Sequence, residues 1–238
     1  MNYFKRYYPV YLAIIGTFTC IALFMTNAIT TAVDNLPLPR SAVLVIDPGH
    51  GGEDGGATSC TGALESQINL EISLRLNDLL HFMGYETVMI RDSDTAVYTP
   101  GTETITAKKV SDLKNRVATV NATANALLLS IHQNQFPEGK YSGAQVFYAE
   151  TEGSQLLAEA MQRQLIRTLN PGSNREVKKA ESVYLMKHIN CTAVLVECGF
   201  LSNAEEEAKL RTEEYQKKLC CVIAAVTSQY LSQTADAV

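Results

Sequence analysis

The sequence has no tryptophan, no low-complexity tract, no internal repeat and no cluster of basic residues. Charged residues make up 19% of the 238 positions, against 46% that are apolar. This composition excludes a disordered, collagen-like or coiled-coil chain and predicts a packed core. Acidic residues outnumber basic ones, 25 to 20, and nothing resembles the basic stripe that binds a phosphate backbone. Nucleic acid is therefore not expected as a partner.

Acidic residues are absent from the first 33 positions, where Lys5 and Arg6 precede an uncharged stretch over 10–33. These 24 residues are enough to span a bilayer. By the positive-inside rule, residues 1–9 stay in the cytoplasm and the rest of the chain is exported. We expect an uncleaved transmembrane anchor, which would hold the protein to the membrane. A cleaved signal sequence is the alternative.

Cysteines are few, and their number after the anchor is odd. None of them has zinc-finger spacing, and a full disulfide framework is excluded. A domain of this size does not depend on disulfides, so we expect small, buried, apolar side chains. The five residues are Cys60, Cys191, Cys198, Cys220 and Cys221.

Residues 34–41 contain two prolines and form a short linker, which leaves one domain over 42–238. Within it, apolar runs of strand length alternate with stretches of helical periodicity. The expected strands are 42–46, 87–90, 126–131, 143–149, 183–186 and 193–196, and the expected helices are 64–83, 109–121, 155–168 and 204–231. Several strands are unbroken apolar runs, typical of a sheet covered on both faces. The pattern predicts an α/β fold: a three-layer αβα sandwich with a mostly parallel open sheet.

Polar residues gather where three of the expected strands end. The first strand leads into Asp47 and His50, the third into His132, and the last ends at Glu197. Glu65 lies at the start of the first long helix, near the same edge. Because ligands bind beyond the carboxyl ends of the strands in such sheets, we expect these side chains to form one site.

Two imidazoles and a carboxylate are the ligand set typical of catalytic zinc, with a fourth position open for water. The residues alone leave open which glutamate, Glu65 or Glu197, is the ligand. Each also has an ordinary alternative, since Glu65 suits a helix N-terminus and Glu197 could cap a helix. The glycine-rich segment 49–56 has an alternative as a phosphate-cradling loop, although it lacks the Walker lysine.

In order and spacing, five segments resemble the zinc-dependent N-acetylmuramoyl-L-alanine amidases of bacterial cell walls: VLVIDPGHGGEDGGA, ALESQINLEISLRL, LLLSIHQNQ, SGAQVFY and VLVECGFLSN. The resemblance covers nearly everything after residue 41. It implies one zinc ion per chain, held by His50, Glu65 and His132, with Glu197 as the catalytic acid/base.

Two further residues have open roles within this resemblance. Asp47 either orients a ligand histidine from behind or belongs to a plain turn. Arg116 matches a recurrent arginine of the family and contacts either the substrate or the sheet.

The resemblance implies hydrolysis of the amide between N-acetylmuramic acid and L-alanine in peptidoglycan. Two strings, PGTETITAKKVSDLKNRV and VYLMKHI, look closest to the germination-specific amidases of the spore cortex. There, removal of the stem peptide precedes formation of the muramic lactam, and the catalytic domain lies outside the cytoplasmic membrane, in the forespore cortex region. The alternatives are another zinc hydrolase of peptidoglycan, either a peptidase or a deacetylase, and a catalytically silent wall-binding module.

Many amidases of this family are blocked by a helical insertion. Here only about 33 residues separate Ala149 from Val183, and the expected helix uses most of them. We therefore expect control from outside the domain, by timed expression, membrane anchoring or an accessory regulatory protein.

Overall fold

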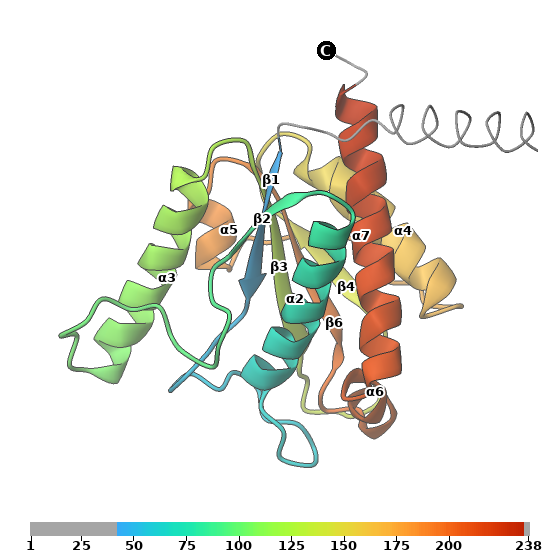
Figure 1. The fold of residues 1–238 in the computed structure, drawn as a ribbon. Coiled ribbons are helices and arrows are strands. Elements are labelled where there is room, and N and C mark those ends of the chain that lie inside the picture. Colours follow the sequence, from blue (N-terminus) through green and yellow to red (C-terminus); the bar gives the residue numbers. More distant parts are fainter. Residues whose placement is uncertain (1–41, 236–238) are drawn as a thin grey trace, which may run out of the picture. The chain divides into compact units, whose positions relative to one another are not determined.

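The computed structural model of the protein describes residues 42–235 (Figure 1). The strands are β1 (Val43–Pro48), β2 (Glu86–Met89), β3 (Ala126–Asn134), β4 (Gln145–Tyr148), β5 (Lys178–Lys179) and β6 (Thr192–Phe200). The helices are α2 (Glu65–Phe82), α3 (Ile105–Ala122), α4 (Ser154–Thr168), α5 (Tyr184–His188), α6 (Ala204–Leu210) and α7 (Glu213–Ala235).

The strands form one sheet in the order β2-β1-β3-β6-β4-β5. β4 runs antiparallel to β6, and every other neighbouring pair is parallel. The predicted α/β class is confirmed, with a mixed sheet. Its three central strands, β1, β3 and β6, are parallel and end at the same edge, which is where the polar residues of the sequence gather.

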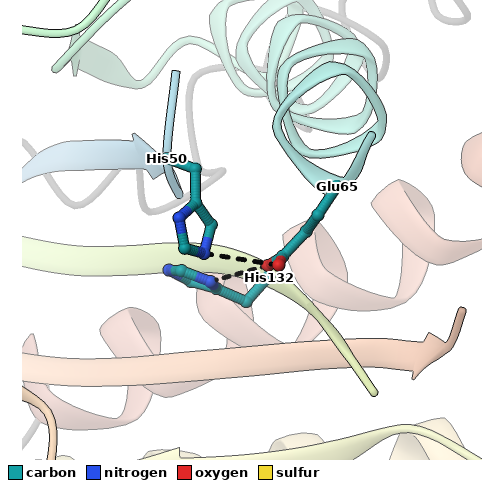
Figure 2. A group of neighbouring side chains, drawn as sticks. All are labelled: His50, Glu65 and His132. Atoms are coloured by element: carbon teal, nitrogen blue, oxygen red, sulfur yellow. Dashed lines mark hydrogen bonds and ion pairs between the residues drawn. The ribbon is translucent and has the colours of Figure 1, made fainter. Parts of the chain in front are cut away.

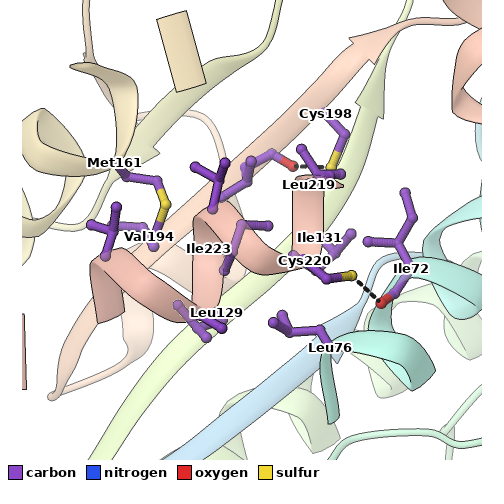
Figure 3. Packing of buried hydrophobic residues seen from close by; sticks show 14 of the residues in the cluster. Ile72, Leu76, Leu129, Ile131, Met161, Val194, Cys198, Leu219, Cys220 and Ile223 are labelled. Atoms are coloured by element: carbon purple, nitrogen blue, oxygen red, sulfur yellow. Dashed lines mark hydrogen bonds between the residues drawn. The ribbon is translucent and has the colours of Figure 1, made fainter. Parts of the chain in front are cut away.

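Helices cover both faces of the sheet, with α2, α4 and α7 on one side and α3 and α5 on the other (Figure 1). The larger core lies under α2, α4 and α7, where Leu129 and Ile131 of β3 pack near Leu76 and Ile223 (Figure 3). Both faces of the central strands are thus buried, which explains their unbroken apolar runs. Packing on both faces fixes the strand ends in space.

One predicted strand is wrong. Residues 183–186 were expected to be extended, but α5 begins at Tyr184. Leu185 and Met186, adjacent on this short helix, are both buried. A helical turn presents both to the core between α3 and the sheet. The short edge strand β5, made of two exposed lysines, was not predicted.

The cysteines of the described range differ in exposure, and Cys191 is half-buried. All five in the described range are free. Cys198 and Cys220 are buried, as expected. The expectation of burial is wrong for Cys60, in the loop before α2, and for Cys221, on the outer side of α7, because both are exposed.

The expected cytoplasmic segment 1–9, the anchor over 10–33 and the linker over 34–41 lie outside the described residues. Among residues 42–235, no helix has the length and hydropathy needed to cross a bilayer.

The burial of β3 in the core predicts how a substitution there changes the stability of the fold. Leu129 is fully buried, so Leu129→Ala should lower the free energy of unfolding by about 2–5 kcal/mol through lost burial and the cavity left behind. Urea unfolding of the variant measures this loss. Leu156→Ala on α4 is the matched control, because its side chain is 57% exposed and its loss should have little effect. Equal losses in the two variants would contradict the assignment of Leu129 to the core.

Candidate metal centre

The site lies where β1, β3 and β6 end. Asp47 in β1 is level with Ser130 in β3, and His132 in β3 is level with Glu197 in β6. His50 is the second residue after β1. The turn that carries it is held beside β3, because Gly49 N donates to Ile131 O. The pairing of parallel strands therefore brings His132 and Glu197 side by side, with His50 close by.

His50, Glu65 and His132 converge on one point (Figure 2). The carboxylate of Glu65 lies between the two rings, with Oε2 at 3.3 Å from Nε2 of His50 and Oε1 at 2.9 Å from Nδ1 of His132. One ligand atom from each residue can be chosen so that all three lie within 4.8 Å of one another. Two imidazoles and a carboxylate at this spacing fit a divalent metal ion such as zinc.

The charge of Glu65 is stabilised in place. Burial alone would raise the pKa of its carboxyl, but hydrogen bonds and charge interactions with His132 and His50 hold the pKa well below its usual range. Burial likewise disfavours the charged form of His50, yet Glu65 and Asp54 raise its pKa to about 9. The buried carboxylate thus favours positive charge at this point, which suits a cation.

Backbone and amide groups hold Glu65 from several sides. Oε2 accepts a hydrogen bond from Ala57 N at 2.9 Å, and Oε1 accepts from Gln133 N at 3.1 Å and from Asn69 Nδ2 at 3.2 Å. Asn69 lies one helical turn after Glu65 on α2, and its amide also donates to the carbonyl of Gly49. The carboxylate is therefore fixed before any metal ion binds.

Sequence reasoning missed Asp54 and Asn69, each four residues after a member of the cluster. Asp54 Oδ2 lies 3.0 Å from Nδ1 of His50, which leaves Nε2 of this ring free to face Glu65. The signal that could have found them is this spacing, since residues four apart meet on a helix or across a tight turn. Among the described residues no hydrogen bond joins Asp47 to either imidazole. The carboxylate that orients a histidine of the cluster is therefore that of Asp54.

Asp47 and Arg116 instead lie beneath the site as a buried ion pair. Asp47 Oδ2 accepts a hydrogen bond from Ser130 Oγ at 2.7 Å, and the guanidinium of Arg116 also contacts Asp112. Burial alone would raise the pKa of Asp47, but Arg116 and then His132 lower it. Arg116 is only 3% exposed, so its contacts are with the protein rather than with a substrate at the surface.

Glycines leave room for the cluster. A Cβ at Gly49 would lie 2.2 Å from Cε1 of His132, and one at Gly56 would lie 2.6 Å from Oε2 of Glu65. Backbone amides of this loop already have partners, since Gly49 N donates to Ile131 O and Gly52 N to Asp94 Oδ1. These contacts disfavour the alternative of a phosphate-cradling loop.

Glu197 completes the group from β6. Its Oε2 is buried and has no hydrogen-bond partner among residues 42–235. Burial raises the pKa of Glu197 to about 7 against the lowering effect of His132, while Glu65 raises the pKa and His50 lowers it by smaller amounts. A carboxyl that gains and loses its proton near neutral pH beside a metal cluster is suited to proton transfer. The two other histidines, His81 on α2 and His188 on α5, lie outside this group.

Comparison with known proteins gives the family. The profile described as N-acetylmuramoyl-L-alanine amidase matches residues 44–227, which is most of the chain. The chain belongs to this amidase family. The germination-specific N-acetylmuramoyl-L-alanine amidase of Bacillus subtilis is 36% identical over 203 residues, covering 85% of this chain and 84% of that protein. The amidase LytC of the same organism is 32% identical and covers 86% of this chain, but only 39% of LytC is matched.

Solved structures agree with the fold of this amidase. The CwlD amidase from Clostridioides difficile, solved in complex with the GerS lipoprotein, has a TM-score of 0.77 and 37% identity. The match covers 80% of this chain and 98% of that one. The catalytic domain of CwlV from Bacillus (Paenibacillus) polymyxa has a TM-score of 0.66 and 29% identity, over 80% of this chain and 98% of that one.

The crowding around Gly56 yields a test of the metal centre. In Gly56→Ala, the added Cβ would lie 2.6 Å from Oε2 of Glu65 and 2.7 Å from Cδ2 of His50. We expect zinc affinity, measured by competition with a chelating dye, to fall about tenfold or more because two members of the cluster must move.

Gly62→Ala is the matched control for this variant. Gly62 also has a positive φ, but no described atom lies within 4 Å of its Cβ position. Both variants carry the strain of the left-handed conformation, about 1–2 kcal/mol, and only Gly56→Ala should lose zinc. Equal zinc affinities would show that the cluster does not hold the ion.

The elevated pKa of Glu197 also predicts a pH dependence of stability. The folded, metal-free amidase binds this proton more tightly than the unfolded chain does, so its free energy of unfolding falls as pH rises from 4.5 to about 7. Glu197→Gln should therefore stabilise the metal-free protein at pH 8 by roughly 2–3 kcal/mol and change little at pH 4. Urea unfolding at the two pH values measures this, with the exposed Glu138→Gln as control. The same difference at both pH values would contradict the shift.

Proposed function

We propose that this amidase holds one zinc ion with His50, Glu65 and His132, and that Glu197 is its catalytic acid/base. The observation that carries the proposal is the convergence of these three ligand atoms beside a buried carboxylate oxygen that has no hydrogen-bond partner in the described part of the chain. The donor set fits zinc in number and type. The substrate that the family implies is the amide between N-acetylmuramic acid and L-alanine in peptidoglycan.

Zinc in such a site supplies Lewis acidity, which activates water and polarises the carbonyl of the scissile amide. The proton transfers belong to Glu197. Its carboxylate takes a proton from the attacking water and then gives one to the alanine nitrogen, because an amine leaves an amide only when it is protonated. Burial raises the pKa of Glu197 to about 7 in the metal-free protein, so this carboxyl holds a proton more tightly than an ordinary glutamate does.

Contacts within the folded protein hold the cluster in position for both proton transfers. Asp54 keeps His50 turned toward the cluster, while Asn69 and two backbone amides hold Glu65. These contacts reduce the reorganisation needed when substrate binds, which is the main source of rate in a fixed polar site.

The biological substrate we propose is spore-cortex peptidoglycan, where removal of stem peptides prepares the muramic lactam needed for germination. The similarity to a germination-specific amidase over most of both chains supports this choice. The uncharged stretch over 10–33 supports an anchor that places the catalytic domain outside the cytoplasmic membrane, in the forespore cortex region.

An accessory protein is part of the proposal. Between β4 and β5, the described chain contains one helix, α4, which packs on β4 and α7, away from the metal centre. The similar CwlD structure contains a lipoprotein partner. We infer control of this amidase by a partner that acts outside the domain.

The activity is tested by mass spectrometry of cortex peptidoglycan incubated with the zinc-loaded full chain and with Glu197→Gln. The wild type should release intact stem peptides with a free N-terminal alanine. Because Glu197 carries the proton transfers, the variant should be slower by about 10²- to 10⁴-fold while binding zinc with similar affinity.

Other products would point to the alternatives. Cleavage within the stem peptide would indicate a peptidase, and released acetate a deacetylase. Equal amounts of product from the variant would refute the role of Glu197. Bound zinc without product from either protein would indicate a missing accessory partner or the silent wall-binding module, and only the first would gain activity when membrane-fraction extract is added. Full activity of the isolated chain would refute the need for an accessory protein.

A further inference from the structure

A buried arginine outside the cluster links the segments that carry two of its members. Arg91 follows β2 and is only 3% exposed. Its Nε donates to Pro48 O at 2.9 Å, and its Nη2 donates to Gly49 O at 3.0 Å and to Ser66 O at 2.8 Å. Gly49 adjoins His50, and Ser66 adjoins Glu65. One planar guanidinium group thus joins the loop of the first proposed ligand to the helix of the second.

The loop that Arg91 holds needs such support. His50 has a φ of 61°, a left-handed backbone conformation that residues other than glycine rarely adopt. Strained residues of this kind persist where surrounding contacts determine them. Arg116 holds the loop from the opposite side, donating to Pro48 O at 3.0 Å and to His50 O at 2.7 Å.

The segment after Arg91 adds to the same support. Nη1 of Arg91 donates to Ser93 O at 2.9 Å, which folds residues 91–95 against the loop. Asp94 Oδ1 then accepts a hydrogen bond from Gly52 N at 3.0 Å. A Cβ at Gly51 would lie 2.4 Å from Thr95 O, so the two segments are in direct contact.

We propose that Arg91 is a positioning residue that sets the spacing between His50 and Glu65, so that the metal centre is formed before the ion binds. The inference rests on the proposed zinc site and adds to it a residue that contacts neither metal nor substrate. The geometry requires the fork of a guanidinium, because one group bonds three carbonyls from two other segments in addition to Ser93 O of its own segment. A lysine reaches such acceptors with a single ammonium and cannot hold all three in a fixed plane.

The test compares Arg91→Lys with wild type in the full chain, using zinc alone as the probe. We expect the zinc dissociation constant to rise about tenfold or more, the range found when groups that orient metal ligands are changed. The increase in Tm on adding zinc should shrink accordingly. At saturating zinc, kcat should recover toward the wild-type value with KM unchanged, because Arg91 does not touch the substrate.

Arg75→Lys is the matched control. Arg75 bonds Gln216 Oε1 at 2.9 Å and pairs with Glu213, joining α2 to α7 at a distance from the loop. Its zinc affinity should equal that of the wild type. A folded Arg91→Lys protein with a lower Tm but a zinc affinity within twofold of wild type would show a purely structural role and overturn the proposal.

A second variant decides the matter where Arg91→Lys does not fold. Asp94 is exposed, and Asp94→Ala removes the bond to Gly52 N without disturbing the core. We expect about a threefold loss of zinc affinity, in line with one hydrogen bond at the surface. Unchanged affinity would then overturn the proposal. Because zinc binding is measured without substrate, a wild type that binds zinc but cleaves nothing, even after addition of a membrane-fraction extract that supplies an accessory partner, refutes the proposed activity and leaves the positioning role tested separately.

Discussion

The carboxylate of Glu65 is the point at which three distant segments of the chain meet. It receives a backbone amide from the glycine-rich loop and another from β3, and it faces the rings of His50 and His132. Because Glu65 is the first residue of α2, its place depends on how that helix packs. Ile68 and Ile72 anchor the helix in the core, so the position of the carboxylate is set by apolar packing as much as by hydrogen bonds.

Much of this fold can be predicted from the sequence because strands buried on both faces are continuous apolar runs. The runs at β1, β3 and β6 are unbroken and apolar, and turn residues bound them clearly. The errors in the predicted elements arise where the helix or strand is short. α5 has five residues, too few for periodicity to separate helix from strand, and β5 consists of two lysines whose pairing depends only on their neighbour β4.

The site divides in the same way. His50, His132 and Glu197 are visible in the sequence because polar side chains follow apolar strands at one edge, and Glu65 is visible because it begins the first long helix near that edge. Arg91 is invisible because its partners are backbone carbonyls, which every residue possesses and no pattern marks. The choice between the two glutamates also required more than periodicity, since both stand at the same edge. Their surroundings separate them: Glu65 accepts several hydrogen bonds, whereas Oε2 of Glu197 accepts none within 42–235.

The contact between Gly49 and the ring of His132 has a consequence for the history of the family. A single methyl group at position 49 would occupy the space of the imidazole, with only 2.2 Å between the carbons. A mutation at Gly49, which has no functional group of its own, can therefore displace His132 from the cluster while the ligand residues and Glu197 all remain in the sequence. Inactive relatives of this enzyme can therefore be recognised by substitutions at such glycines as well as at the ligands themselves.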